Sequence, residues 1–382
     1  MTAYLDYNAT TPLDDRVREA MIKSLEDFGN PSSSYETGRK VRLMIDSARE
    51  ELASFIGAES GEIVFSSGAT ESNNMAILGV MKNESLTKKG DHLITTAIEH
   101  PSVLNVCESL EKEGYELSYV PVDKDGIVNP EDIRRSIKEN TRLISVMAVN
   151  NEIGSIQPLE DIVGIAKEKG VIVHTDAVQA IGKLGVDVKS PGVDLLSMSA
   201  HKIYGPKGIG ALYIRRGLKL KPLSFGGSHE KGRRPGTENS TGIAGFAECI
   251  RCLKDEMTEE SLKISRLRER LENGIIESIA DVRVNGHPEK RVPGTLSVSF
   301  GSVDGQAILL QLDSVGISVS TGSACKSGSG ETSRVLSAIG LSEDMARSTI
   351  RFSVGRFSDE DQVDYVLEKL PGVISSLRAL LP

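Results

Sequence analysis

The stretch VIVHTDAVQ at residues 171–179 decides the fold class, because it has the pattern of a buried strand that ends in polar groups. Its first residues are apolar and mostly β-branched, as in the continuous hydrophobic strands of a parallel sheet. Asp176 stands where such a strand would emerge at the edge of the sheet, and Gln179 follows one helical step later. A carboxylate there could pair with a protonated ring nitrogen, while helix capping by Asp176 is the structural alternative.

Similar short runs of apolar and β-branched residues precede this stretch along the chain. They lie at residues 62–65, 92–96, 116–121 and 143–149. Segments with helical spacing of apolar residues lie between them, at residues 74–82, 102–113, 130–139 and 158–169. This alternation predicts an α/β domain with a mainly parallel central sheet. In such sheets, ligands collect at the carboxyl ends of the strands.

The pattern changes beyond the first two-thirds of the chain. A long helix is expected over residues 239–279, followed by strands at 295–300, 316–320 and 350–354 and a closing helix at 359–380. This order predicts a smaller α+β domain that the long helix joins to the larger one. We therefore expect a large domain at residues 13–256, and a small domain built from residues 1–12 and 257–382.

Composition excludes several classes of function. The chain has 382 residues, a net charge of −9, no Trp and 4% aromatic residues, so nucleic acid is not an expected partner. No apolar stretch approaches the roughly 20 residues that span a bilayer, so no membrane is expected either. Four cysteines in a chain of this length do not form a disulfide framework. With no secretory signal at the N-terminus, we expect a cytoplasmic protein.

The segment SSGATESNN at residues 66–74 is a candidate phosphate site. It follows an expected strand and opens an expected helix, so backbone N–H groups are free at the positive end of the helix dipole. Thr70 adds a hydroxyl donor. An ordinary helix N-cap would show the same pattern, so this segment alone does not decide its role.

The segment SMSAHKIYGPKGIG at residues 197–210 carries a hydroxyl, an imidazole and an amine directly before a turn rich in Gly and Pro. A lysine held near a phosphate site and a carboxylate can form a Schiff base with an aldehyde cofactor. A lone lysine is usually a solvated surface charge, so the assignment of Lys202 depends on the rest of the chain.

Taken together, these segments and others resemble the cysteine desulfurases, the NifS/IscS-like branch of the class V aminotransferase family of fold-type I PLP enzymes. The resemblance covers essentially the whole chain. The motifs that carry it are YLDYNATT (4–11), GNPSS (29–33), SGATE (67–71), EH (99–100), VNNEIG (149–154), HTDAVQ (174–179), SAHK (199–202), PGTEN (235–239), GSAC (322–325) and IRFS (350–353).

The resemblance implies a role for each residue that would face pyridoxal 5'-phosphate (PLP). Lys202 would form the Schiff base with the cofactor, Asp176 would hold its ring nitrogen, and Gln179 would contact its phenolic oxygen. His100 would stack on the ring and help to move protons. The residues that would bind the phosphate are Ala69, Thr70, Ser199 and His201, with Thr237 reaching the phosphate of the neighbouring subunit in a homodimer.

The resemblance also implies how L-cysteine is held. Arg351 would bind its carboxylate, aided by Asn8 and Asn151. Elementary chemistry agrees, because a guanidinium fork matches a carboxylate with two parallel hydrogen bonds. No metal is expected.

The four cysteines differ in their surroundings. Cys107 lies in an apolar helical pattern and is expected to be a small core residue. Cys249 and Cys252 have C-x-x-C spacing but no second ligand pair and no strand-to-helix redox context, which disfavours zinc or redox chemistry. Cys325 lies in a segment rich in Ser and Gly, beside Lys326, and a neighbouring cation favours the nucleophilic thiolate. We expect Cys325 to be the sulfur nucleophile.

The resemblance predicts that sulfur passes from L-cysteine to Cys325 as a persulfide, leaving L-alanine. A sulfur-acceptor protein, such as an iron–sulfur scaffold, would then receive it, or the sulfur would serve tRNA thiolation. The alternatives are a PLP lyase acting on selenocysteine, an aminotransferase that does not use Cys325, and a non-catalytic sulfur-carrier scaffold. The presence of Lys202, Asp176 and Arg351 counts against a scaffold, which has no use for an electron sink.

Three positions depart from the pattern of the family. Arg334 replaces a usual His, Ser228 replaces the third of three glycines, and Lys326 stands where Thr is common. The first and third lie around the segment of Cys325, so they bear on the choice of sulfur acceptor rather than on the contacts with PLP.

Overall fold

The computed structural model describes residues 1–322 and 332–380 of the chain. Its largest sheet has seven strands in the order β2-β8-β7-β6-β5-β3-β4. Their bounds are β2 Ile63–Ser66, β3 His92–Thr96, β4 Glu116–Val120, β5 Thr141–Ser145, β6 Ile172–Asp176, β7 Leu195–Ser199 and β8 Gly210–Ile214. Strands β4, β3, β5, β6 and β7 pair in parallel, and only β8 runs against its two neighbours. The expected α/β class with a mainly parallel sheet is confirmed.

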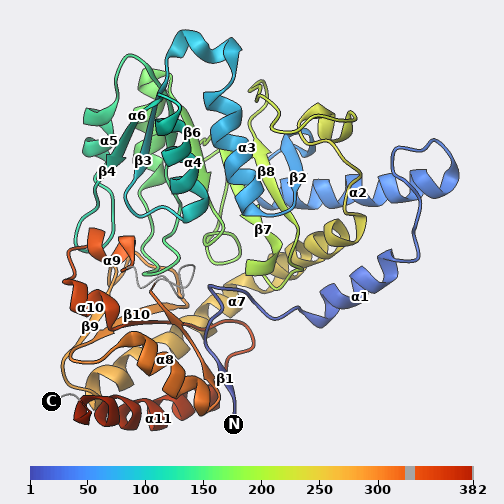
Figure 1. The fold of residues 1–382 in the computed structure, drawn as a ribbon. Coiled ribbons are helices and arrows are strands. Elements are labelled where there is room, and N and C mark those ends of the chain that lie inside the picture. The colour runs from blue at the N-terminus through green and yellow to red at the C-terminus, as the bar shows by residue number, and fades with distance from the viewer. Residues whose placement is uncertain (323–331, 381–382) are drawn as a thin grey trace.

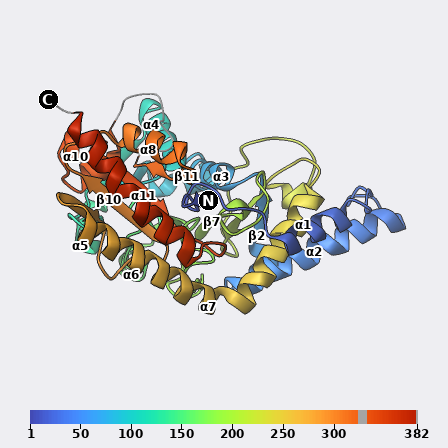
Figure 2. The same cartoon turned by 90° about the horizontal axis from the view of Figure 1, so that it is seen from below.

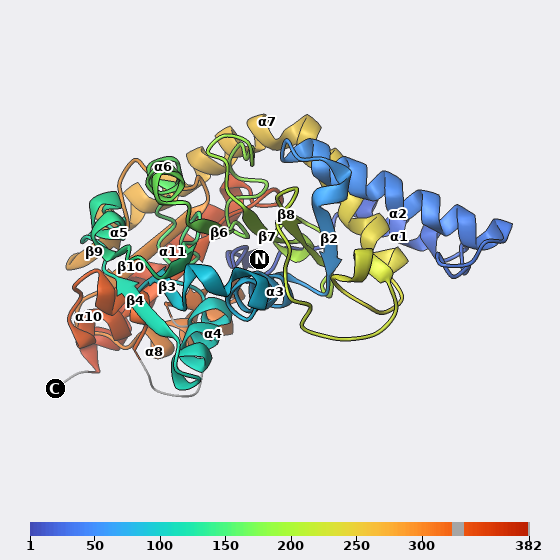
Figure 3. The same cartoon turned by 90° about the horizontal axis from the view of Figure 1, so that it is seen from above.

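Helices cover both faces of this sheet. Their bounds are α1 Asp15–Ser24, α2 Glu36–Phe55, α3 Ala69–Met81, α4 Pro101–Lys112, α5 Pro130–Ser136, α6 Leu159–Lys169, α7 Ser240–Ser278, α8 Gly305–Ser314, α9 Arg334–Ala338, α10 Glu343–Arg347 and α11 Glu360–Ala379. Figure 3 shows α3 and α4 on one side of the sheet and α2, α6 and the first part of α7 on the other.

Successive strand residues feed opposite faces, as the pleat requires. On β6, Ile172 packs in the core under α3 and α4, and its neighbour Val173 packs in the core under α2, α6 and α7. The same division separates Leu195 from Leu196 on β7. Both faces are therefore apolar, and strands buried on both faces read as continuous hydrophobic runs rather than as an alternating pattern.

A second sheet and a second core lie at the other end of the molecule (Figure 1). Four antiparallel strands form it in the order β12-β13-β10-β9, and a separate short pair joins β1 to β11. Their bounds are β1 Ala3–Tyr4, β9 Val282–Asn285, β10 Thr295–Phe300, β11 Ile317–Ser318, β12 Ser320–Thr321 and β13 Thr349–Ser353. Helices α8 and α11 pack against these strands in one hydrophobic cluster.

Helix α7 contributes to both cores. Ile243 and Phe246 from its first half belong to the core of the large sheet, while Leu267 and Leu271 from its second half belong to the other core. The N-terminal residues Ala3 and Leu5 pack in the second core as well. The two cores support the expected division of the chain, whose bounds at residues 12 and 256 stay a prediction.

Several elements differ from those expected. The strand expected at 143–149 is β5, which ends at Ser145; beyond it Val146 and Ala148 keep backbone hydrogen bonds to β6 before the chain turns. Helix α3 begins at residue 69, five residues before the expected start. The expected start was late because the first turn of the helix is polar and shows no periodic apolar residues. Strands β7 and β8 and helices α1 and α2 were not expected from the pattern.

Helices α1 and α2 project sideways from the rest of the molecule (Figures 1 and 2). Both pack against α7 at their inner ends. Large apolar side chains are exposed on this projection, among them Phe28 and Leu43. Within residues 1–322 and 332–380, no helix is long and apolar enough to cross a membrane.

Candidate active site

The side chains expected to bind the cofactor gather at one edge of the large sheet, where the parallel strands end. Asp176 is the last residue of β6, and Ser199 is the last residue of β7. A single turn of 3-10 helix, Ala200–Lys202, follows β7 and carries Lys202. His100 follows β3 as the N-cap of α4. Parallel strands bring these residues to the same edge, which is the usual ligand-binding edge of an α/β sheet.

Asp176 is buried, and its carboxylate accepts two hydrogen bonds from the protein. Asn73 Nδ2 donates to Oδ2 at 2.7 Å, and the backbone N–H of Val178 donates to Oδ1 at 3.0 Å. The same Asn73 nitrogen donates to Ser102 Oγ at 2.8 Å. Ser102 Oγ lies 2.8 Å from Nδ1 of His100. A continuous chain of hydrogen bonds therefore links Asp176 to His100 through Asn73 and Ser102.

His100 is held in a defined tautomer by the backbone at the start of α4. The backbone N–H of Ser102 donates to Nδ1 at 3.1 Å, so Nδ1 is an acceptor and the proton of the neutral ring lies on Nε2. Burial lowers the pKa of His100, Asp176 opposes this shift, and Lys202 lowers the pKa further. The imidazole is thus neutral near pH 7 and able to take up a proton.

Lys202 lies against the N-terminal segment of the chain. Its Nζ donates to the backbone carbonyls of Asn8 and Ala9, at 2.6 Å each. Asn8 is itself buried and held by distant residues: its backbone N–H donates to Ser353 Oγ at 2.9 Å, and Nδ2 donates to Thr295 Oγ1 at 2.8 Å. The N-terminal segment therefore lies between Lys202 and the second core.

The expected phosphate site has the geometry of an anion cradle. Gly68 precedes α3 with φ of 152°, a conformation that favours glycine, and a Cβ there would meet no protein atom within 4 Å. Helix geometry leaves the N–H groups of the first turn, at Ala69 and Thr70, without intrahelical acceptors. Ser199 is buried and Thr70 is exposed at the surface of this turn. Burial lowers the pKa of the nearby His201 to about 4, with Lys202 and Lys207 acting in the same direction.

Thr237 is exposed in the loop that precedes α7. Arg234 from that loop forms an ion pair of 3.0 Å with Glu71, whose carboxylate also accepts the backbone N–H of Ser67 at 2.5 Å. The structure thus brings the loop of Thr237 against the phosphate turn of its own chain.

Arg351 on β13 is buried at the same end of the site. Its Nη2 donates to Asp6 Oδ1 at 2.7 Å, and its Nη1 donates to the carbonyl of Asn151 at 3.0 Å. Asn8 Nδ2 donates to the same carbonyl at 3.1 Å. Among the described residues, Nε of Arg351 has no hydrogen-bond partner although it is buried. An unpaired buried donor is costly, and an anionic group of a ligand would satisfy it.

Three residues of the site were missed in the sequence. Asn73 and Ser102 connect Asp176 to His100, and Lys183 contacts both Gln179 and Asn8. Asn73 lies inside the segment at 66–74, and Lys183 follows Gln179 at the spacing of one helical turn. These were the available signals, but Asp176, the partner of Asn73, and Asn8, a partner of Lys183, each lie more than a hundred positions away in the chain.

The described cysteines are free and buried. Burial raises the pKa of the Cys107 thiol to about 12 and raises the pKa of Cys249 and Cys252, which disfavours the reactive thiolate. Among the residues that the structure describes, no His, Cys, Asp and Glu side chains form a metal-binding group. Cys325, the expected nucleophile, lies outside the described residues.

The geometry of this edge fits PLP. The cradle at Gly68 suits the phosphate of PLP. The buried carboxylate of Asp176 suits its ring nitrogen, and the amine of Lys202 suits its aldehyde. The buried donor on Arg351 would face the carboxylate of an amino acid. Gly68, Asp176 and Lys202 all lie at the ends of strands of the large sheet, whereas Arg351 lies on β13 of the second sheet.

A family model described as "Aminotransferase class-V" matches residues 3–366. The chain belongs to the class-V aminotransferase family. Within that family, it is 49% identical over 380 residues to "Cysteine desulfurase IscS" of Dictyoglomus turgidum, covering 99% of this chain and 96% of the relative. It is 46% identical over 381 residues to "Cysteine desulfurase IscS" of Methanosarcina thermophila, covering 99% and 93%.

Comparison with solved structures gives a similar result. A "NifS-like protein" is 39% identical with a TM-score of 0.93, over 99% of this chain and all of that one (100%). A structure described as "SspA in complex with cysteine" is 37% identical with a TM-score of 0.84, over 94% and 100%. The resemblance to the NifS/IscS-like branch and the expected fold-type I architecture are confirmed.

Proposed function

We propose that this chain is a cysteine desulfurase, which uses PLP to remove sulfur from L-cysteine and leaves L-alanine. One observation carries the proposal: the segment at Asn8 joins Lys202, at the edge of the large sheet, to Asn151 and the buried Arg351. An attachment point for an aldehyde cofactor and a binding point for a carboxylate thus share one site. The relatives described as cysteine desulfurases, at 46 to 49% identity, support the same activity.

When PLP is bound to Lys202, it supplies an electron sink for the electron pair left when a bond at Cα of the substrate breaks. Asp176 keeps a proton at the ring nitrogen, which strengthens that sink. Gln179 donates an N–H to the phenolic oxygen. The free amine of Lys202 would take up the Cα proton of the substrate, and the neutral His100 would be the second proton acceptor.

Arg351 binds the carboxylate of L-cysteine through the edge that carries Nε. Asp6 and the carbonyl of Asn151 hold the other nitrogens of the guanidinium, so its orientation is set before the substrate arrives. Asn8 supports this arrangement because its amide donates to Asn151 and to Thr295.

The sulfur-transfer step belongs to Cys325. Its thiolate attacks the sulfur of the substrate, so that an S–S bond forms while the bond from Cβ to sulfur breaks. The electron pair of the broken bond stays on the carbon skeleton, and Cβ then takes up a proton to become the methyl group of alanine. The sulfur remains on Cys325 as a persulfide. The two sulfur atoms together lose two electrons and Cβ gains them, so the reaction needs no external oxidant or reductant.

We further propose a homodimer in which Thr237 reaches the phosphate of the neighbouring subunit. The exposure of Thr237 supports this, since a surface loop is able to extend towards a second chain. The persulfide would pass to a sulfur-acceptor protein such as an iron–sulfur scaffold. A cytoplasmic location suits this chemistry, because a reducing compartment keeps the Cys325 thiol free.

The test is direct. Purified protein reconstituted with PLP is expected to be yellow, to release sulfide from L-cysteine in the presence of a thiol, and to form alanine in equal amount. Borohydride is expected to attach the cofactor to the peptide that contains Lys202, as read by mass spectrometry. Label on another lysine would overturn the site, and amino transfer without sulfide would overturn the activity.

A further inference from the structure

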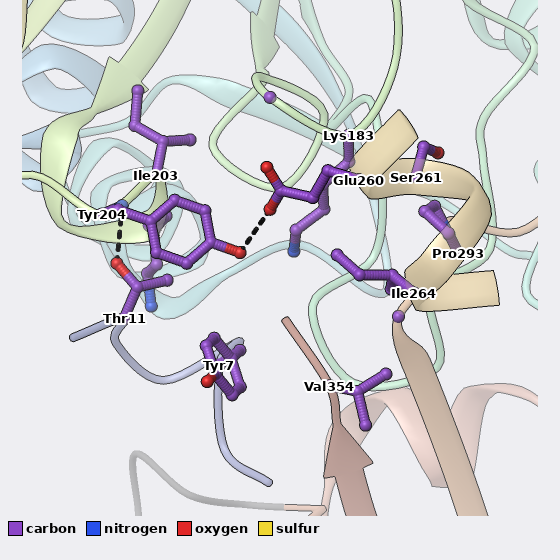
Figure 4. A pocket seen from close by; sticks show the side chains of 13 residues that line it. Tyr7, Thr11, Lys183, Ile203, Tyr204, Glu260, Ser261, Ile264, Pro293 and Val354 are labelled. Atoms are coloured by element: carbon purple, nitrogen blue, oxygen red, sulfur yellow. Dashed lines mark hydrogen bonds between the residues drawn. The ribbon is translucent and has the colours of Figure 1, made fainter. Parts of the chain in front are cut away.

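Lys183 lies inside the site, although no role follows for it from the mechanism. It belongs to the turn after β6, in which the backbone N–H of Ile181 bonds to Ala177 and that of Lys183 bonds to Ala180. This turn places Lys183 one helical step beyond Gln179. Figure 4 shows its side chain among those that line a small cavity, together with Tyr7, Glu260 and Ile264.

The amine of Lys183 contacts two amide side chains. Nζ donates to Asn8 Oδ1 at 2.9 Å and to Gln179 Oε1. An ammonium group only donates hydrogen bonds, whereas an amide has a donating and an accepting edge. Lys183 therefore requires both amides to turn their oxygen atoms towards it.

The donating edges of the two amides consequently point away from Lys183. Gln179 Nε2 donates to the backbone carbonyl of Asn8 at 3.1 Å, the same carbonyl that accepts from Lys202. Asn8 Nδ2 donates to Thr295 Oγ1 and to the carbonyl of Asn151. The donor of Gln179 thus lies beside Lys202, where the phenolic oxygen of a cofactor bound to that lysine would be.

We propose that Lys183 is a positioning residue, which fixes the amide of Gln179 with its N–H edge towards the phenolic oxygen of PLP. Without Lys183, the amide of Gln179 is free to rotate and to present its oxygen to another oxygen. The proposal rests on the proposed function, because the phenolic oxygen is that of PLP.

The proposed role does not depend on the charge of the lysine. Burial lowers the pKa of Lys183 to about 7, with Lys202 and then Arg351 lowering it further. A neutral amine still carries two N–H groups, which suffice for the two amide oxygens. The orientation of Gln179 is therefore kept on both sides of neutral pH.

The test uses the PLP-bound enzyme and the pH titration of its visible absorption band, without substrate. A donor on the phenolic oxygen competes with the protonated Schiff base for that oxygen and keeps the midpoint of the titration low. Lys183→Met is expected to move the midpoint upward by about one pH unit and to weaken PLP binding about ten-fold. Lys189→Met, an exposed lysine six residues further on, is the matched control and is expected to keep both values.

A double-mutant cycle with Gln179→Leu separates positioning from charge. If Lys183 acts through Gln179, Lys183→Met leaves the midpoint of the Gln179→Leu enzyme almost unchanged. An equal shift in both backgrounds, or no shift in the parent enzyme, would overturn the proposal. Should Lys183→Met not fold, Lys183→Ala, which also lacks a hydrogen-bond donor, carries the same comparison. A parent protein that does not bind PLP at Lys202 would contradict the proposed function instead.

Discussion

At the scale of single residues, the side chain of Asn73 is the least obvious part of the site. Its amide nitrogen is shared between Asp176 and Ser102, and its oxygen has no partner among the described residues. Such an orientation leaves both donors of the amide committed to groups that would face the cofactor. Asn73 thereby sets the position of the carboxylate that would hold the ring nitrogen and holds the Ser102 hydroxyl that contacts Nδ1 of His100.

Replacing Asn73 by Leu therefore tests this link. Two buried hydrogen bonds are lost, at about 1 kcal/mol each, so we expect PLP affinity and kcat to fall about ten-fold or more. Equilibrium dialysis and steady-state assays of sulfide release measure these quantities. Asn140→Ala, whose side chain bonds only to surface carboxylates, is the control. Equal values for both variants would show that Asn73 has no such role.

Cys325 provides the residue-level test of the sulfur acceptor. Cys325→Ser is expected to abolish sulfide release from L-cysteine and to leave PLP binding and the spectral change on adding L-cysteine intact. The reason is that serine keeps the size, while its hydroxyl stays protonated and oxygen cannot form a persulfide. Cys252→Ser and Cys107→Ser are expected to keep the activity. Activity at the parent rate in Cys325→Ser, with loss in one of the others, would identify a different nucleophile.

At the scale of elements, the loop before α7 is anchored by a buried ion pair. Arg49 on α2 donates to both carboxylate oxygens of Glu230, at 2.7 Å each, and the backbone N–H of Phe65 on β2 donates to the same carboxylate at 3.1 Å. Glu230 and Lys231 both have positive φ, so this loop is bent sharply around the ion pair. Glu230 lies a few residues before Thr237, so this ion pair connects the loop of Thr237 to α2.

Glu230→Ala removes that anchor. An unpaired Arg49 and an unpaired backbone N–H are expected to cost about 3 kcal/mol of unfolding free energy. Urea unfolding measures this loss, and the affinity for PLP is expected to fall with it because the loop of Thr237 loses its support. Glu168→Ala, which removes an exposed partner of Arg134, should cost less than about 1 kcal/mol. A similar small loss in Glu230→Ala would contradict the proposed anchor.

The elements differ in how well the sequence predicts them. Strand β3 and strand β10 were predicted at their observed bounds, because each combines apolar and β-branched residues and ends near a change of pattern. Strands β7 and β8 were missed, since Leu195–Ser199 contains no β-branched residue and overlaps a segment chosen for its chemistry. Motifs predicted candidate cofactor residues, but the contact of Asn73 with Asp176 and that of Lys183 with Asn8 each span more than a hundred positions, which no local pattern reveals.

At the scale of the whole molecule, buried carboxyl groups make stability depend on pH. Burial raises the pKa of Glu99 to about 8, against hydrogen bonds from Met147 and Thr96 that lower it. The folded chain therefore keeps a proton on Glu99 between its ordinary pKa, near 4.5, and about 8, while the unfolded chain loses it. Because the folded state binds more protons in this window, Glu99 favours folding at low pH and loses this contribution as pH rises.

Glu99→Gln removes this titration while keeping the shape of the side chain. We expect the unfolding free energy of the parent protein, compared with that of Glu99→Gln, to fall by up to about 1.4 kcal/mol per pH unit between pH 5 and pH 8. Urea unfolding of the cofactor-free proteins at several pH values measures the difference. Glu113→Gln, an exposed partner of Lys82, should follow the parent curve. Parallel curves for the parent and Glu99→Gln would rule out a protonated Glu99.

The two ends of the chain meet in the site, and this has a consequence for biosynthesis. Asn8 is bonded to Ser353 and Thr295, and Lys202 rests on the carbonyls of Asn8 and Ala9. When a ribosome has made the last strand of the large sheet, it has not yet made Thr295 and Ser353, which hold this N-terminal segment. Contacts of such long sequence separation form late. The segment at Asn8 is therefore expected to reach its place in the site only after residue 353 has been made, and a fragment that ends before β13 also lacks Arg351.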